Sequence, residues 1–135
     1  MTGTRRETEM DTKDLLVLDG GMGRELARRG APFRQPEWSA LALMEAPETV
    51  REVHQAYVAS GARVITTNSY ALVPFHIGDE RFAADGERLA ALAGQLARDV
   101  ADGQAGAVQV AGSLPPLFGS YRADLFDAGR VSELA

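Results

Sequence analysis

The residues best suited to chemistry follow two short apolar runs. Asp19, Gly20 and Gly21 come directly after the first run, and Thr66 and Thr67 close the second. The Asp19 carboxylate suits a ligand ammonium group, and glycines, which lack a Cβ, let backbone N–H groups approach a ligand carboxylate. An amino acid presents both of these groups. The alternative is that Asp19 caps a following helix while the two glycines form a tight turn.

The second run ends in an unusually polar segment, Thr66-Thr67-Asn68-Ser69-Tyr70. Its hydroxyl and amide groups suit a carboxylate or an amino group, although Thr and Asn side chains also cap strand ends. Trp38 and Phe33 are predicted to pack over the mouth of the sheet. Farther along the chain, Tyr121 and Arg122 are either ligand contacts or ordinary exposed residues.

Neither a metal site nor a nucleotide site is predicted. His54 falls beside the apolar face of a predicted helix and His76 in a predicted loop, and neither has a partner at ligand spacing. We expect both histidines to be structural or solvated. A dinucleotide-binding fingerprint needs a third glycine where this chain has Leu26, and an acidic residue where the second run ends in Thr67.

Apolar runs and helical spacing of apolar residues alternate along the chain, and both are bounded by glycine and proline. The predicted strands cover residues 15–18, 64–67 and 108–111, and the predicted helices cover residues 24–29, 47–60 and 89–100. Because the first strand is continuously apolar, we expect it to be buried on both faces. Pro32 and Pro36 predict an irregular stretch before the second helix, and Pro74 and Gly78 mark a loop before the third.

Strands that alternate with helices predict parallel strands joined by helical crossovers, which is an α/β fold. The ends of the strands, at Asp19, Asn68 and Gly112, are farther apart than the roughly 30 residues of a minimal unit, so the loops carry extra material. A further helical pattern begins at Val131. Three parallel strands leave two unpaired edges, so we expect either that a complementary chain or self-association completes the sheet, or that the chain is a piece of something larger.

The composition is that of an ordinary globular domain, with 45% hydrophobic and 24% charged residues among 135. A net charge of −5 argues against binding to nucleic acid or to an anionic membrane. No apolar run approaches the roughly 20 residues that span a bilayer. Residues 1–14 are predicted to form a flexible leader without the apolar segment of a secretory signal, so we expect a cytoplasmic protein.

The motifs as an ordered set resemble the homocysteine S-methyltransferase family. The resemblance runs from about Leu15 to Phe126, which is nearly the whole chain. It is carried by Leu18-Asp19-Gly20-Gly21-Met22-Gly23-Arg24-Glu25-Leu26, by Trp38-Ser39-Ala40, by Val64-Ile65-Thr66-Thr67-Asn68-Ser69-Tyr70 and by Ala111-Gly112-Ser113-Leu114-Pro115-Pro116. It implies that residues 15–135 are the N-terminal portion, about three to four β/α units, of a (β/α)8 TIM barrel, which takes about 250 residues in full.

The resemblance also implies roles for individual residues in binding homocysteine. Asp19 would hold the amino group of the substrate, while Gly20 and Gly21 would offer backbone contacts. Thr67 would help to anchor the amino-acid end, and Met22 would line the thioether side. In the family, the homocysteine thiolate accepts a methyl group and becomes methionine. The residues do not identify the methyl donor.

Members of the family hold a zinc ion with cysteines late in the barrel, and the metal stabilises the homocysteine thiolate. This chain contains no cysteine, so it carries no such zinc ligands and no catalytic residue is assigned within it. We therefore expect the chain alone not to catalyse methyl transfer. Two alternatives remain open: a non-catalytic amino-acid-binding or assembly module that completes its sheet through a partner chain, and an independent Rossmann-like enzyme.

Overall fold

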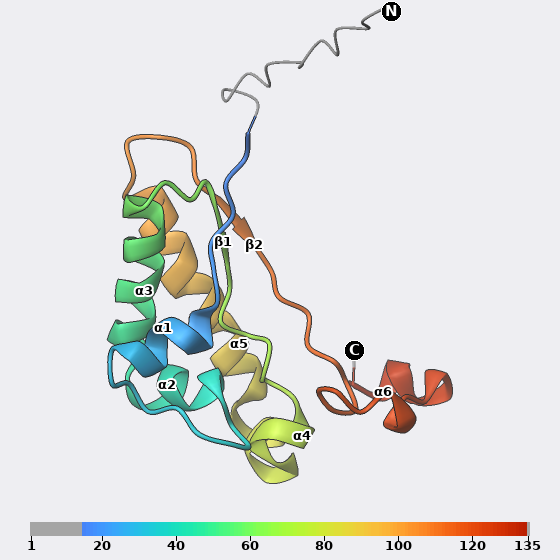
Figure 1. Cartoon of the computed structure of the whole chain (residues 1–135). Helices are drawn as coiled ribbons and strands as arrows, with labels where there is room; N and C mark the ends of the chain where they lie inside the picture. Colours follow the sequence, from blue (N-terminus) through green and yellow to red (C-terminus); the bar gives the residue numbers. More distant parts are fainter. Residues whose placement is uncertain (1–14, 135) are drawn as a thin grey trace, which may run out of the picture.

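The computed structural model, which describes residues 15–134, contains a small parallel sheet. Strand β1 (Val64–Thr66) pairs in parallel with β2 (Gln109–Ala111). Figure 1 shows the two strands side by side, with residues 15–20 running along the other edge of β1. The α/β class and the parallel pairing are therefore confirmed, whereas the predicted leader, residues 1–14, lies outside the described residues.

The first apolar run, residues 15–18, sits where a neighbouring strand would be, but it forms only an isolated parallel bridge, between Leu18 and Val64. The Val17 carbonyl accepts a hydrogen bond of 2.8 Å from the Arg63 N–H, and the Asp19 N–H donates to the Val64 carbonyl at 2.9 Å. The prediction of burial on both faces is wrong, because the four side chains are 51–63% exposed. Within residues 15–134, the run has a strand beside it only on the β1 side.

Two of the predicted helices are confirmed within a few residues. Helix α1 (Met22–Arg28) follows the first run, and α3 (Pro47–Ala59) begins at its proline, whose missing N–H costs nothing in a first helical turn. Gly61, with φ of 110°, takes a left-handed conformation directly after α3, where a residue with a Cβ would be strained. Helix α2 (Ser39–Glu45) was not predicted, since it has no capping side chain and follows a proline-rich stretch.

The segment predicted as a loop around Pro74 and Gly78 is helical on both sides of the glycine. Helix α4 (Pro74–Ile77) is a single turn, and α5 (Asp79–Asp102) then runs for 24 residues. The first part of α5 shows little apolar periodicity because much of it is exposed, so its start was predicted too late. The acidic residues Asp79 and Glu80 stabilise that start, where the helix dipole is positive.

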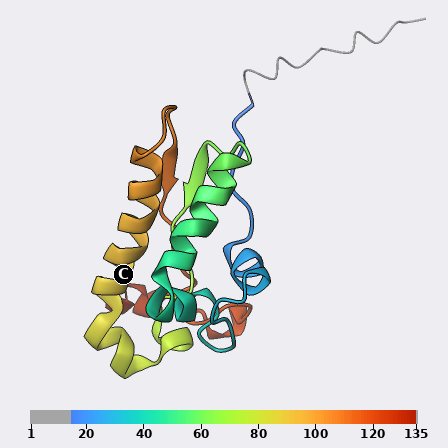
Figure 2. The same cartoon turned by 90° about the vertical axis from the view of Figure 1, so that its left-hand side faces the viewer.

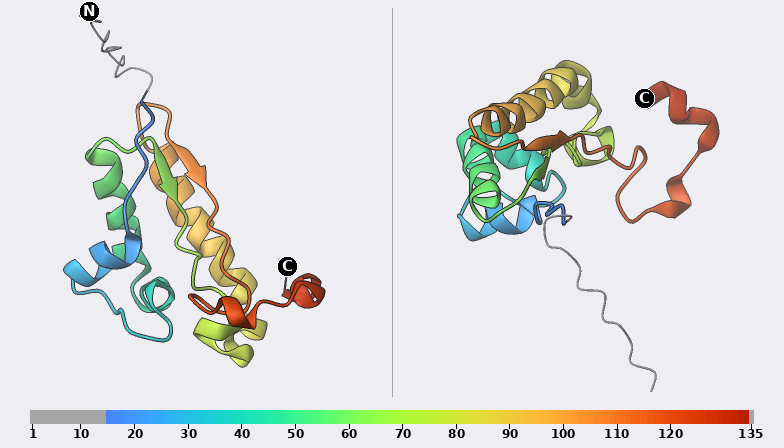
Figure 3. Two further views of the ribbon diagram at one scale, coloured as in Figure 1. Left: turned by 45° about the vertical axis from the view of Figure 1, so that its right-hand side comes forward. Right: turned by 90° about the horizontal axis from the view of Figure 1, so that it is seen from above.

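Helices α3 and α5 lie side by side on one face of the sheet, as Figures 2 and 3 show. Two groups of buried side chains fill the space between these elements. The first lies among α1, α2, α3 and α5 and includes Leu26, Leu43, Val50, Val53, Leu89 and Leu96. The second lies under the strands and includes Val58, Ile65, Ala97, Val100 and Val108. Among residues 15–134, no helix is long and apolar enough to cross a membrane.

After β2 the chain first contacts α4, where Ser120 bonds to His76, and then leaves the body of the molecule. Figure 3 shows this segment projecting from the side of the sheet away from α3 and α5. It contains two short 3₁₀ turns, Ala123–Leu125 and Ala128–Arg130, followed by α6 (Val131–Leu134). The helical pattern predicted to begin at Val131 is thus confirmed for one turn.

Candidate functional site

A cavity of about 320 Å³ lies at the carboxyl ends of the strands. Four of the five residues predicted to bind substrate, Asp19, Gly20, Met22 and Thr67, line this cavity. Gly21 is not among its lining residues, and its carbonyl instead accepts a hydrogen bond of 3.2 Å from the Tyr57 hydroxyl. The two polar segments that follow the apolar runs thus face one common space, in the place where parallel α/β folds put their chemistry.

The Asp19 carboxylate is fixed by the strand beside it. The Thr66 backbone N–H donates to Asp19 Oδ2 at 2.7 Å, and the Thr66 hydroxyl donates to Oδ1 at 3.1 Å. The alternative that Asp19 caps the next helix is wrong, because Gly21 is the N-cap of α1 and no side chain bonds to that end. A carboxylate oxygen accepts more than one hydrogen bond, so Asp19 keeps acceptor capacity for a ligand ammonium group.

Gly20 is required by the packing of a neighbouring aromatic ring. A Cβ built on Gly20 would lie 2.8 Å from the Tyr57 hydroxyl oxygen and 2.9 Å from Cε1 of the same ring. Tyr57 belongs to α3, so the bare backbone at position 20 lets that helix approach the turn after the first run. Burial raises the pKa of the Tyr57 phenol, so the group is a hydrogen-bond donor at neutral pH.

The Thr67 hydroxyl belongs to a hydrogen-bonded chain that joins the ends of β1 and β2. Ser69 Oγ donates to the Ser113 carbonyl at 2.8 Å and has no second proton to give. In the 2.8 Å contact between Thr67 Oγ1 and Ser69 Oγ, Thr67 is therefore the donor. The Ser113 N–H in turn donates to Thr67 Oγ1 at 3.0 Å. Thr67 is left with acceptor capacity only, which suits an ammonium group and not a carboxylate.

Aromatic rings also line the cavity. Trp38 and Tyr70 both line it, with ring centroids 6.3 Å apart and ring planes only 6° from parallel. Phe33 lines it as well, and its ring lies so close to Gly23 that a Cβ there would be 2.7 Å from Phe33 Cε2. The expectation that Trp38 and Phe33 pack at the mouth of the sheet agrees with these positions. Aromatic faces attract cations, so these rings suit a positively charged group.

The Trp38 backbone is strained. Its φ of 49° and ψ of −129° lie outside the favoured regions for a residue with a side chain, a conformation that costs about 1–3 kcal/mol. Such strain persists only where the surrounding contacts hold it, and it gathers at binding sites. The ring of Trp38 is thus fixed at the cavity by its neighbours and not by local backbone preference.

His54 is a buried residue of α3, fully shielded from solvent, and neither of its ring nitrogens has a hydrogen-bond partner among residues 15–134. Burial lowers the pKa of His54, and the negative charge of Asp19 works in the opposite direction. The imidazole is therefore neutral at neutral pH. Within residues 15–134, His54 is a buried core side chain of α3.

His76, which lies in α4, is also buried, but it is fully bonded. Nδ1 lies 2.8 Å from the Pro36 carbonyl oxygen, and Nε2 lies 2.6 Å from Ser120 Oγ. Both ring nitrogens face protein groups, so this histidine is structural too.

The residues present do not form the zinc site that the resemblance implies. The chain has no cysteine, and the part of it that the structure describes contains no group of three His, Asp or Glu side chains able to hold a metal ion. Both histidines are buried: His76 is bonded to protein groups, and His54 belongs to α3. We therefore assign no step of any reaction to a metal bound by this chain.

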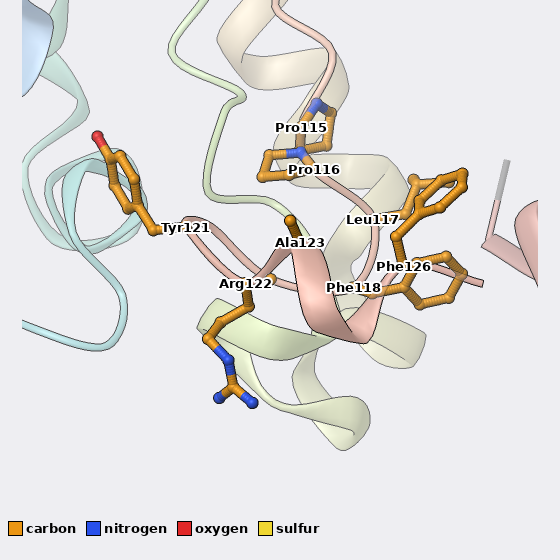
Figure 4. A pocket seen from close by; sticks show the side chains of 9 residues that line it. Pro115, Pro116, Leu117, Phe118, Tyr121, Arg122, Ala123 and Phe126 are labelled. Atoms are coloured by element: carbon orange, nitrogen blue, oxygen red, sulfur yellow. The ribbon is translucent and has the colours of Figure 1, made fainter. Parts of the chain in front are cut away.

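A larger and more apolar pocket, of about 670 Å³, lies in the segment after β2. Figure 4 shows Pro115, Pro116 and Phe118 gathered around it. Tyr121 and Arg122 belong to this pocket and do not line the Asp19 cavity. Both are exposed, and Arg122 pairs with Asp124 at 2.7 Å, a contact that raises the pKa of the Arg122 guanidinium.

Sequence reasoning missed the roles of three residues that organise the cavity. Thr66 holds the Asp19 carboxylate, Tyr57 packs on Gly20, and Ser113 bonds to Thr67. Thr66 was visible as part of a polar strand end. The contributions of Tyr57 and Ser113 depend on how α3 and the segment after β2 fold back on the sheet, which no local pattern encodes.

Comparisons with known proteins agree with this geometry. The family model for homocysteine S-methyltransferase matches residues 16–133. Homocysteine S-methyltransferase of Escherichia coli K12 is 40% identical over 124 residues, which cover 85% of this chain and 39% of that protein. Selenocysteine methyltransferase of Astragalus bisulcatus is 37% identical over 87 residues, covering 64% of this chain and 26% of that protein.

A solved structure of the E. coli homocysteine methyltransferase, in its metallated form, superposes with a TM-score of 0.66 at 36% sequence identity. The superposition covers 89% of this chain and 43% of that enzyme. The chain therefore spans about two-fifths of the length of the relatives that it matches most extensively. With a family model matched along nearly its whole length, the chain belongs to the homocysteine S-methyltransferase family.

Proposed function

We propose that this chain binds the amino-acid head of homocysteine as the N-terminal portion of a (β/α)8 methyltransferase barrel. The observation that supports this most directly is the Asp19 carboxylate, which is held rigid by two hydrogen bonds from Thr66 at the edge of a 320 Å³ cavity. A carboxylate that is already oriented loses little freedom when it receives an ammonium group. The reaction would form a bond between the homocysteine sulfur and a methyl carbon, and break the bond from that carbon to its donor.

The roles of the neighbouring residues follow from their remaining hydrogen-bonding capacity. Thr67 supports the ammonium group as an acceptor, because its own proton is given to Ser69. The backbone at Gly20 borders the same space, and Gly21 adjoins it. Met22, which also lines the cavity, offers a polarisable thioether to the substrate's side chain. We propose this division of roles for the five predicted residues.

Calorimetric titration of the chain with reduced L-homocysteine tests the proposal. Asp19→Asn should weaken binding by about tenfold or more, because a hydrogen bond between charged groups contributes about 1.5–3 kcal/mol. Asp102→Asn is the matched control, since Asp102 pairs with Arg98 at the far end of α5. A wild-type chain that gives no binding signal, or an Asp19→Asn variant that binds as tightly as wild type, would contradict the proposal.

We further propose that the chain alone binds substrate without transferring methyl groups. A thiol with an ordinary pKa of about 8.5 is mostly protonated at neutral pH, and residues 15–134 place no metal-binding group at the cavity to favour the thiolate. Methionine formation should therefore be absent when the 135 residues are assayed with homocysteine, zinc and a methylated donor. Turnover by the isolated chain would show that its own residues activate the thiol.

A second candidate function, assembly through the open sheet, is favoured by the exposed apolar run. Leu15, Leu16, Val17 and Leu18 are all more than half exposed beside a sheet of two named strands. A complementary chain or a second copy would cover these side chains and remove them from water. Sedimentation at several concentrations should show self-association, or binding when the complementary part of the barrel is added. A monomer under both conditions would remove this candidate.

A further inference from the structure

His76 bonds to two segments that are distant from it in the sequence. Its Nδ1 lies 2.8 Å from the Pro36 carbonyl oxygen, two residues before Trp38, and its Nε2 lies 2.6 Å from Ser120 Oγ, in the segment after β2. His76 is 3% exposed and Ser120 is 7% exposed, so water does not compete strongly for either bond. The imidazole therefore ties α4 to two loops that meet near the cavity.

The direction of both hydrogen bonds follows from the chemistry of the partners. A carbonyl oxygen only accepts, so Nδ1 carries the proton and donates to Pro36. In the neutral ring, Nε2 is then an acceptor, and the Ser120 hydroxyl donates to it. The second bond thus fixes the rotation of the Ser120 side chain as well as its position.

Ser120 stands in a turn whose geometry depends on this anchor. Gly119 before it has a φ of 138°, and a Cβ there would lie 2.8 Å from Phe75 Cε2, so the turn packs directly on α4. Tyr121 after it has a φ of 61°, a left-handed conformation that a tyrosine rarely adopts. As Figure 4 shows, the Tyr121 ring points away from the Phe118 and Phe126 side chains that line the same apolar pocket.

The Tyr121 ring meets Trp38 instead. Their centroids are 6.0 Å apart, and the His76 ring lies 5.1 Å from Trp38. Trp38 lines two cavities: the Asp19 cavity, and a second one of about 350 Å³ lined by His76, Ser120 and Tyr121. The indole is therefore the shared wall between them, and the contacts from His76 and Tyr121 support it.

We propose that His76 is a positioning residue for the homocysteine site, and that it acts through Ser120 and Tyr121 to hold the Trp38 ring in place as a wall of the Asp19 cavity. The proposal rests on the proposed function for its link to substrate. The positioning of the Trp38 ring by His76, Ser120 and Tyr121 does not depend on the proposed function, because it is argued from hydrogen bonds and ring contacts alone.

Trp38 is the chain's single tryptophan, so its fluorescence reports on this wall without interference from other indoles. Ser120→Ala removes the donor to His76 and should raise the acrylamide quenching constant of Trp38 about twofold, as expected when a local contact opens. The affinity for L-homocysteine should fall about threefold to tenfold, the range for a residue that acts through its neighbours. Ser132→Ala, at an exposed serine in α6, is the matched control and should change neither quantity.

A double-substitution cycle separates positioning from general loosening of the fold. Tyr121→Leu should raise Trp38 quenching as Ser120→Ala does, and the double variant should not exceed the larger single effect, because both act on one contact. Far-UV circular dichroism checks that each variant is folded, and His76→Leu replaces Ser120→Ala if that variant is not. Wild-type quenching in the folded Ser120 or His76 variant, or additive effects in the cycle, would overturn the proposal.

Homocysteine binding and Trp38 quenching together distinguish a failure of the proposed function from a failure of this inference. Asp19→Asn should weaken homocysteine binding by about tenfold or more and leave Trp38 quenching unchanged in the absence of ligand. If the wild-type chain does not bind homocysteine but Ser120→Ala still exposes Trp38, the positioning of the wall stands and the substrate assignment falls.

Discussion

The two apolar runs of this chain differ in how far their side chains are buried. Ile65, in β1, is fully buried and Val64 is 9% exposed, whereas Leu16 and Leu18 are 57% and 63% exposed. Both runs have extended backbone and pair in parallel. The difference is that β1 has chain on both edges and helices α3 and α5 against one face. Apolar composition therefore predicts the extended conformation, but only the neighbouring elements determine burial.

Hydrogen bonds also join the two runs at their polar ends. Asp19 ends the first run and Thr66 ends the second, and the bonds between them cross from one strand end to the other. The exposed run is therefore anchored at its polar end even though its apolar side chains are not covered. This explains how a weakly packed segment presents a well-ordered carboxylate.

The largest expected effect is on stability, and it contrasts the two runs directly. Ile65→Ala should lower the free energy of unfolding by about 2–4 kcal/mol, because it leaves a cavity in the core under the sheet. Leu16→Ala should change the same quantity by less than about 0.5 kcal/mol, as for other exposed positions. Urea denaturation of both variants measures these values. Similar losses in the two variants would mean that the first run is buried in solution.

The junction between the runs should give the next largest effect. Thr66→Val removes the hydroxyl that donates to Asp19 Oδ1 and keeps the backbone bond to Oδ2, so we expect a loss of about 1–2 kcal/mol in unfolding free energy. Binding of L-homocysteine should weaken as well, because the carboxylate becomes less ordered. Thr66→Ser retains a hydroxyl and should behave much like wild type. Equal behaviour of the Val and Ser variants would show that the hydroxyl bond contributes little.

The buried histidine near this junction predicts a pH dependence. Burial lowers the pKa of His54 below its usual 6.5, so the unfolded chain takes up this proton first as the pH falls. Stability should therefore be independent of His54 above pH 6.5 and should decrease below it, by at most about 1.4 kcal/mol per pH unit for one proton. Urea denaturation of His54→Leu between pH 7.5 and 5.5 should give a flatter profile than wild type. If the free energy of unfolding depends on pH equally in both proteins, groups other than His54 cause the dependence.

The smallest effect on stability should come from placing a charge in the exposed run. Leu16→Lys should leave the free energy of unfolding within about 0.5 kcal/mol of wild type, because the side chain is already in water. It should nevertheless reduce any association through this edge, since a lysine on a strand edge opposes pairing. Sedimentation of both proteins at matched concentrations measures this difference. Stronger association of the lysine variant would exclude the run as the contact surface.

Much of the fold could be predicted from the sequence, because local chemistry decides it. Pro47 marks the start of α3, Gly61 follows its end, and the β-branched run at Val64 gives β1. The start of α5 was missed because its first turns are exposed and carry little apolar periodicity. Helix α2 was missed because its stability comes from burial of its apolar residues, including Leu41 and Leu43, and not from a capping motif.

The candidate site was predictable in its location but not in its internal bonding. Asp19 and Thr67 were expected at one cavity because parallel strands end at the same edge, and both line it. The Thr67 hydroxyl donates its proton to Ser69, and Thr66 donates to Asp19. Both contacts depend on the register between neighbouring chain segments. Register is a tertiary property, so no spacing in the sequence reveals which hydroxyl remains free.

Helix α5 gives the molecule its cooperativity. Leu89 and Leu96 belong to the core among the helices, while Ala97, the residue after Leu96, and Val100 belong to the core beneath the strands. At 1.5 Å per residue, this single rod is about 36 Å long and passes through both. Because both cores include residues of α5, we expect its central amides to exchange with solvent deuterium only when the whole chain opens.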